Sequence, residues 1–139
     1  LKKKLQERGI SFTDFKKIKD MEIIRRAAGG SARTLVISTD QGELQVEGEY
    51  EIRYVLNQEG EVIRQDDSAY TLSILPSAYF VMDLQKGKKG ITGFTLYGGG
   101  FGHGVGMSQN AAKAMAQSGK TYEEILAMFY WNCQLAKKY

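Results

Sequence analysis

The sequence is poor in residue types that often build functional sites: its 139 residues include one cysteine, one proline and one histidine. A lone thiol at Cys133 cannot form an internal disulfide or a zinc site made of several cysteines. No apolar run approaches the roughly 18 residues of a membrane-spanning helix. The sequence starts with leucine and shows no signal peptide, so we expect a piece of a longer polypeptide.

An excess of charge of either sign is also missing. The chain has 19 Lys and Arg against 16 Asp and Glu, which gives a formal net charge of +3. This balance is too weak to indicate nucleic acid binding, and it suits a partner with scattered negative charge, such as a cell-wall polymer. With 42% hydrophobic and 25% charged residues, the composition is typical of a globular protein with a core of its own.

The apolar patterning predicts an α+β fold with a mostly antiparallel sheet, a short middle helix and a C-terminal helical hairpin. Two β-branched runs flank Gly29–Gly30, and a second turn at 40–42 predicts another hairpin. Apolar residues at helical spacing predict the middle helix within 49–57. We expect 57–68 to be a mobile polar loop, and 69–84 to form two strands or one strand bent at Pro76.

The C-terminal third carries clear helix signals. Ser108 is a predicted N-cap and Gly119 a predicted helix stop. Thr121 and Glu124 have the spacing of a capping box for a second helix. We expect Ile125, Met128 and Phe129 to form the apolar face of that helix.

The single histidine, His103, lies in a glycine-rich segment, since six of the 16 glycines fall between Gly98 and Gly106. Glycines let a ligand approach the backbone closely. N–H groups just before a helix favour an oxyanion, a carboxylate or a sugar hydroxyl. An imidazole can donate, accept or transfer a proton near pH 7. A tight turn in which His103 bonds to the backbone is an equally good interpretation.

Several other motifs are incomplete. The string SGKT at 118–121 lacks the P-loop glycine, because Ala114 stands there. The glycines do not have dinucleotide-binding spacing, and GMSQN misses the nucleophile elbow because Asn110 replaces its last glycine. His103 and Cys133 without a third ligand are weak for zinc, and a half-buried, inert thiol is the simpler expectation. We therefore expect no cofactor and no metal.

The string GFGHGVGMSQNAAKAMAQSGKTYEEILAMFY, residues 100–130, resembles the signature of the stage II sporulation protein D (SpoIID/LytB) family. Weaker matches upstream include GGSARTLVISTDQG, VEGEYEIRYVL and ILPSAYF. The likeness covers roughly 15–139, so we expect these residues to be the C-terminal part of a SpoIID-like domain. Residues 1–14 are expected to be a basic N-terminal helix or connector.

This resemblance implies the C-terminal part of a peptidoglycan lytic transglycosylase that cleaves denuded glycan strands during sporulation or cell-wall remodelling. The family's proposed catalytic glutamate lies in a stretch that is absent here, so the resemblance implies no catalytic residue in this chain. A non-catalytic glycan-binding module, or an amidase modifier of the LytB type, is the alternative.

The resemblance also implies a place and partners. The parent protein would be membrane-anchored or secreted in a bacterium and would act outside the cytoplasm. Its partners would be peptidoglycan glycan strands and, in second place, other sporulation or cell-wall hydrolases. For two residues a structural role is an alternative to substrate binding. Arg53 could form an ion pair on the helix surface, and Ser77 could be a turn residue. The candidate substrate-binding residues are His103, Ser108, Gln109, Gly102, Gly104, Ser77, Arg53 and Arg33.

Overall fold

The computed structural model describes residues 1–58 and 60–136. The chain divides into two compact units, Leu1–Gly104 and Val105–Tyr139. Within the described residues there are four helices and seven strands, and every pair of strands is antiparallel. The predicted α+β class, with its middle helix and C-terminal helical hairpin, is confirmed.

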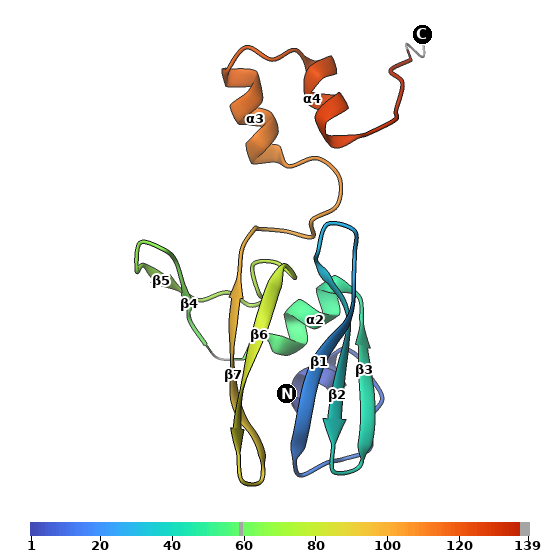
Figure 1. Cartoon of the computed structure of the whole chain (residues 1–139), viewed down its shortest axis with the longest axis vertical. Coiled ribbons are helices and arrows are strands. Elements are labelled where there is room, and N and C mark those ends of the chain that lie inside the picture. Colours follow the sequence, from blue (N-terminus) through green and yellow to red (C-terminus); the bar gives the residue numbers. More distant parts are fainter. Residues whose placement is uncertain (59, 137–139) are drawn as a thin grey trace. The chain divides into compact units, whose positions relative to one another are not determined.

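The first unit is built on a three-stranded sheet in the order β1-β2-β3 (Figure 1). Leu35, Ile37 and Val46 alternate with outward-facing residues and are fully buried. Helix α2 packs against β2 and β3 and contributes Ile52 to the same core. The elements are β1 (Ile18–Arg26), β2 (Ala32–Thr39), β3 (Gly42–Glu47) and α2 (Glu49–Leu56).

The N-terminal helix α1 (Lys2–Glu7) is part of this core. Leu5 is fully buried, and the Arg8 guanidinium forms two hydrogen bonds of 2.6 Å with the Glu51 carboxylate on α2. The helix stops before Gly9, whose φ is +64°. Residues 1–9 are therefore packed against α2, with Leu5 in the core, and are not simply a solvated connector.

The segment between α2 and the second hairpin differs from expectation. Instead of an unstructured loop, 57–68 contains β4 (Val62–Ile63), which pairs with β5 (Ala69–Tyr70). Asp67 makes the turn with a φ of +60°, and the Arg64 guanidinium stacks 4.6 Å from the Tyr70 ring centroid. The prediction of a loop without strands was wrong because this turn and stacking pair were not recognised.

The strand predicted before Pro76 is formed only at Ala69–Tyr70, as β5, and no strand spans 71–79. Proline has no N–H to donate, and other groups here bond to α2 rather than to a strand. The Leu75 N–H donates to Arg53 O at 3.3 Å, and the Asn57 side chain donates to Leu72 O at 2.8 Å. The strand predicted after Pro76 is confirmed as β6 (Phe80–Gly87), paired with β7 (Gly90–Gly98).

The second unit holds α3 (Gln109–Gln117) and α4 (Tyr122–Phe129), which contact each other (Figure 1). The predicted caps are confirmed: Ser108 Oγ accepts from Ala111 N, and Thr121 and Glu124 form a complete capping box. Ile125 is buried, but Met128 is 71% exposed, so the prediction that it helps form an apolar packing face was wrong.

No helix among the described residues has the length and apolar character needed to cross a membrane.

Candidate functional site

The glycine segment belongs to two units and is described in two parts. Its first part, Gly98–Gly104, runs from the end of β7 and includes exposed His103. Gly102 has a φ of +110° and an added Cβ would meet nothing within 4 Å. Glycine is therefore needed at 102 for the backbone conformation and not for lack of space.

This first part is fastened to the irregular segment Pro76–Tyr79. The Gly102 N–H donates to Pro76 O at 2.8 Å, and the Gly99 N–H donates to Tyr79 O at 3.0 Å. Ser77 and Gly102 form an isolated parallel bridge. The structure thus brings together two predicted site residues that are distant in sequence, Ser77 and Gly102.

The Ser77 hydroxyl is used within this cluster. It donates to Gly99 O at 2.5 Å and accepts from the Tyr79 N–H at 3.0 Å. A hydroxyl has one hydrogen and two lone pairs, so the donor is committed and one acceptor position remains. The main role of the Ser77 hydroxyl is therefore to hold the loop in shape. Its remaining lone pair can accept a hydrogen bond from a ligand.

Arg53 is placed behind this loop, with a side chain only 11% exposed. Its Nε donates to Leu75 O at 2.9 Å and an Nη donates to Pro76 O at 3.2 Å. Its other Nη forms a 3.1 Å ion pair with Glu49, one turn earlier on α2. Arg53 is therefore suited to position the loop, while its low exposure and occupied donors leave little for direct contact with a ligand.

Pro76 O is the meeting point of these contacts, because both Arg53 and Gly102 donate to it. We name the group Glu49, Arg53, Pro76, Ser77 and Gly102 the loop anchor. Glu49 was not among the predicted residues. The signal that could have found it is the i,i+4 spacing of an acid and a base on one helix.

Arg33 has a different place. It is half-buried in β2, and its backbone carbonyl accepts from the Gly48 N–H at 2.9 Å, just before α2. Among the described residues, no hydrogen bond or ion pair links its side chain with the loop anchor. The structure does not bring Arg33 together with the other candidates by any such contact.

Ser108 and Gln109 belong to the second unit, with the capping bond from Ala111 N to Ser108 Oγ measuring 3.3 Å. Gln109 is the first residue of α3 and is exposed. In the same unit, a Cβ on Gly106 would lie 3.4 Å from the Tyr130 hydroxyl. The cap uses one lone pair of the Ser108 oxygen, so the Ser108 O–H and the exposed Gln109 amide both remain candidates for ligand binding here.

Exposed aromatic side chains accompany the loop in the first unit, and sequence analysis missed them. Tyr79, Tyr97 and Phe101 are 56%, 61% and 80% exposed. Tyr97 pairs with Val81 one step from Gly98, and the Tyr79 ring lies against Gly30 at the β1–β2 turn. Aromatic rings beside hydrogen-bonding groups provide flat apolar contact and directional polar contact together.

Cys133 does not have the half-buried position expected for it. The thiol is exposed, and its Sγ lies 3.8 Å from Trp131 O. Within 1–58 and 60–136, no three His, Cys, Asp or Glu side chains gather in a way that could hold a metal ion.

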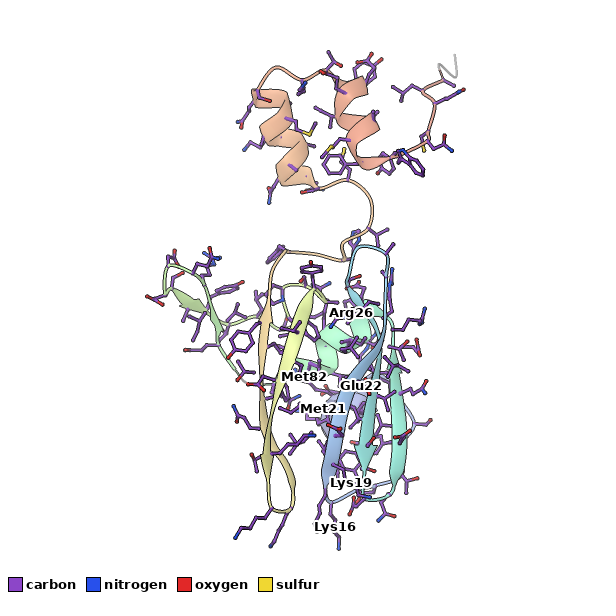
Figure 2. All side chains as sticks on the ribbon, viewed as in Figure 1. Lys16, Lys19, Met21, Glu22, Arg26 and Met82 are labelled. Atoms are coloured by element: carbon purple, nitrogen blue, oxygen red, sulfur yellow. The ribbon has the colours of Figure 1, made fainter. Side chains whose placement is uncertain are left out.

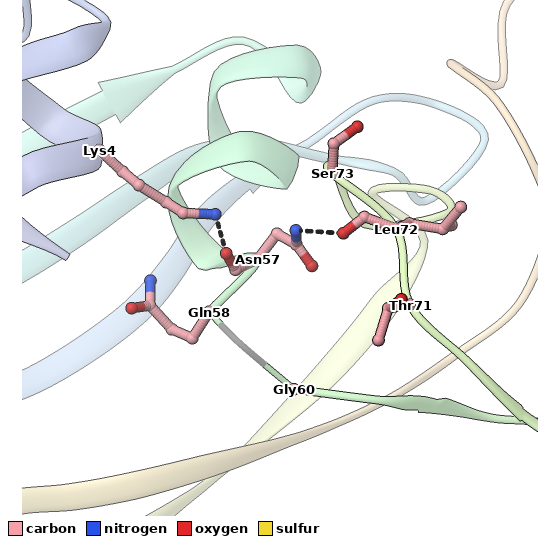
Figure 3. A pocket seen from close by; sticks show the side chains of 7 residues that line it. All are labelled: Lys4, Asn57, Gln58, Gly60, Thr71, Leu72 and Ser73. Atoms are coloured by element: carbon pink, nitrogen blue, oxygen red, sulfur yellow. Dashed lines mark hydrogen bonds between the residues drawn. The ribbon is translucent and has the colours of Figure 1, made fainter.

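A cavity of about 330 Å³ lies elsewhere in the first unit (Figure 3). The Asn57 side chain is 7% exposed at its edge and bonds to Leu72 O, while Lys4 Nζ donates to Asn57 O. The cavity includes none of the predicted site residues. It is lined by Lys4, Asn57, Gln58, Gly60, Thr71, Leu72 and Ser73.

A family model matches this mixed sheet-and-helix unit. The chain belongs to the family described as "Domain of unknown function (DUF8618)", whose profile matches residues 1–106. This range includes the loop anchor and His103, and it ends before α3. No solved structure matches the chain.

Three relatives extend this comparison. The amidase enhancer of Bacillus subtilis is 49% identical over 43 residues, 31% of this chain and 6% of that protein. Stage II sporulation protein D of the same organism is 50% identical over 38 residues, 27% of this chain and 11% of that protein. An uncharacterised protein of Brachyspira hyodysenteriae is 43% identical over 70 residues, 49% of this chain and 18% of that protein.

These matches confirm the resemblance to the SpoIID/LytB family that the glycine segment predicted. The matched stretches span less than a fifth of each relative's length. The chain is therefore related to sporulation and cell-wall proteins. The division at residues 14 and 15, and the substrate-binding roles of the named residues, stay predictions.

Proposed function

We propose that this chain is the glycan-binding part of a SpoIID-type peptidoglycan lytic transglycosylase that acts outside the bacterial cytoplasm on denuded glycan strands. The observation that carries the proposal is the loop anchor. It fixes Gly102 through Pro76 O and so presents exposed His103 on a defined backbone.

The chemistry of the loop fits a saccharide. Sugar hydroxyls need directional donors and acceptors, which the His103 imidazole and the remaining Ser77 acceptor position would supply. Sugar rings also present apolar faces, which would pack on exposed Phe101 and Tyr79. Gly104, next to His103, would let a sugar approach the backbone closely. Separately from this loop, the exposed Gln109 amide of the second unit would offer a glycan strand a contact of its own.

Five carboxyl groups of the chain have a lowered pKa, which is unfavourable for acid catalysis. Side-chain hydrogen bonds lower the pKa of four of them: Glu51, Asp66, Glu123 and Glu124. For Asp40, burial raises the pKa, but the N–H groups of Lys17 and Lys16 outweigh it and the net shift is downward. A glycosidic general acid needs a raised pKa, so none of these five groups is suited to protonate the glycosidic oxygen.

A second function follows from the amidase enhancer, whose 49% identical stretch is slightly longer than that of stage II sporulation protein D. In this version the chain binds glycan and modifies a partner amidase without cutting. If another part of the protein supplies a catalytic glutamate, the transglycosylase function is favoured. If that glutamate is absent, the amidase-modifier function is favoured.

The test uses glycan strands stripped of stem peptides. The chain and a form extended upstream are incubated with the strands, and mass spectrometry is used to detect anhydro-muramic ends. We expect both forms to sediment with the glycan and only the extended form to produce these ends. His103→Ala should weaken sedimentation several-fold, while Lys113→Ala, on exposed α3 surface, should not.

The outcomes separate the two functions. If both forms sediment but neither cuts, the transglycosylase is excluded and stimulation of a purified amidase becomes the deciding assay. If neither form sediments with the glycan, both functions fail.

A further inference from the structure

Lysines gather at the end of the first unit where β1 begins and the β6–β7 hairpin turns (Figure 2). An open hollow of about 580 Å³ lies there, and a Cβ on Gly90 would overlap Ile18 O, so the two segments are in direct contact. Four lysines line the hollow: Lys2, Lys16, Lys17 and Lys89. We name the site formed by these four lysines the lysine hollow.

Only part of this positive charge is balanced. Lys2 forms a 2.6 Å ion pair with Asp14, and nearby Lys86 forms one of 3.2 Å with Asp20. The Asp40 carboxylate accepts from the backbone N–H groups of Lys16 and Lys17, at 3.0 and 3.1 Å, and not from their ammonium groups.

Three ammonium groups therefore remain for a partner. In the part of the chain that the structure describes, no ion pair involves Lys16, Lys17 or Lys89, and all three are exposed. Exposed Lys19 and Lys88 extend the same end. The local excess of positive charge is larger than the net charge of +3 for the whole chain would suggest.

We infer that the lysine hollow binds a linear phosphate-bearing polymer that carries no bases. Several ammonium groups around an open hollow suit a flexible chain of repeated negative charges, because each lysine neutralises one phosphate and releases its counterions. The cluster shares none of its residues with the loop anchor, so this inference does not depend on glycan binding.

Two other anionic partners fit less well. A membrane surface calls for exposed apolar side chains that enter the lipid, and among the described residues no large exposed apolar side chain lies within 12–18 or 86–92. Single-stranded nucleic acid calls for aromatic stacking platforms, but Phe15, the aromatic residue that lines the hollow, is only 4% exposed.

The test is a binding titration with linear polyphosphate that carries a fluorophore, followed by anisotropy over a range of salt concentrations. If each of the three unpaired lysines contacts one phosphate, log Kd should change with log salt with a slope of about 2. The variant Lys16→Gln/Lys17→Gln/Lys89→Gln should bind about tenfold more weakly or worse, with a slope near 0.

The matched control is Lys3→Gln/Arg64→Gln/Lys113→Gln, which removes the same number of charges from exposed positions outside the hollow. It should bind like the unchanged chain, and circular dichroism checks that both variants are folded. Equal weakening in both variants would overturn the site, because binding would then follow net charge alone. The inference also fails if phosphatidylglycerol vesicles or a poly-dT oligonucleotide bind as tightly as polyphosphate, or if orthophosphate competes at equal phosphate concentration.

Discussion

The two units of the chain are stabilised in different ways. Among the described residues, thirteen of the fourteen buried hydrophobic residues lie in Leu1–Gly104, and the remaining one is Ile125. The second unit instead has hydrogen bonds between residues close in sequence: the Ser108 cap, the capping box and the 2.8 Å Lys120–Glu124 pair. The first unit is stabilised by the burial of apolar side chains from segments that are distant in sequence. The second unit is stabilised largely by hydrogen bonds and ion pairs between residues that are close in sequence.

The largest expected effect is on the core of the first unit. Leu35 is fully buried, so Leu35→Ala should lower the free energy of unfolding by about 4 kcal/mol through lost burial and a cavity. Met128→Ala in the second unit should cost about 0.5 kcal/mol or less, because Met128 is 71% exposed. Urea unfolding measures both. Equal costs would contradict the difference between the units.

Arg53→Ala should cost about 3 kcal/mol, because it leaves the Leu75 carbonyl and the nearby Glu49 carboxylate without this partner and removes one of the two donors to Pro76 O. It should also speed hydrogen exchange of the Gly102 amide, whose acceptor is Pro76 O. Nuclear magnetic resonance measures both, with Arg33→Ala as control. An unchanged exchange rate at Gly102 would show that Arg53 does not position the loop.

Gly102→Ala should cost about 1–2 kcal/mol, since alanine is strained at a φ of +110°. Gly99→Ala is the matched control, because a Cβ there meets nothing within 4 Å and no positive φ applies. We expect glycan sedimentation to fall for the first variant and to persist for the second. Loss in both would mean that bulk, and not backbone conformation, decides binding.

Thr121→Ala removes half of the capping box and should cost about 1 kcal/mol. Amide exchange in α4 should become faster while exchange in β2 stays the same, because the lost bond from Glu124 N is local. Faster exchange in β2 as well would show that the two units are stabilised together.

The smallest expected effect is a change in the pH dependence of stability below pH 4.5. The Arg8 side chain, by hydrogen bonding, lowers the pKa of Glu51 below its usual 4.5. The stability that this pair contributes is present above pH 4.5 and is lost as the pH falls through the lowered pKa. Glu51→Gln should therefore have a lower Tm than the unchanged chain at neutral pH, and the gap should narrow below pH 4.5. If the gap stays constant as the pH falls below 4.5, the Glu51 charge does not contribute to stability.

Much of the fold could be predicted because its signals are local. Leu44 and Val46 alternate with polar residues, and both are buried on β3. The Thr121 and Glu124 pair identified the start of α4. The prediction for 71–79 failed because a side chain from another element, Arg53, bonds to its carbonyls, and apolar alternation carries no sign of that.

The candidate site was predictable in part for the same reason. Ser77 and Gly102 were named from motif resemblance, and the structure adds that they are bridged. No pattern in the sequence indicates that Pro76 O serves two donors, since a main-chain oxygen exists at every position. The exposed Phe101 and Tyr79 were missed because exposure depends on tertiary packing.

The acceptor that links α2 to the histidine loop is a main-chain atom, and this has a genetic consequence. A carbonyl oxygen persists whatever residue is encoded at position 76, so a single missense change there cannot delete the acceptor. The donors differ: the guanidinium is lost with any replacement of Arg53, and the backbone shape at Gly102 tolerates few alternatives. Mutational screens for loss of the loop should therefore recover changes at 53 and 102 far more often than at 76.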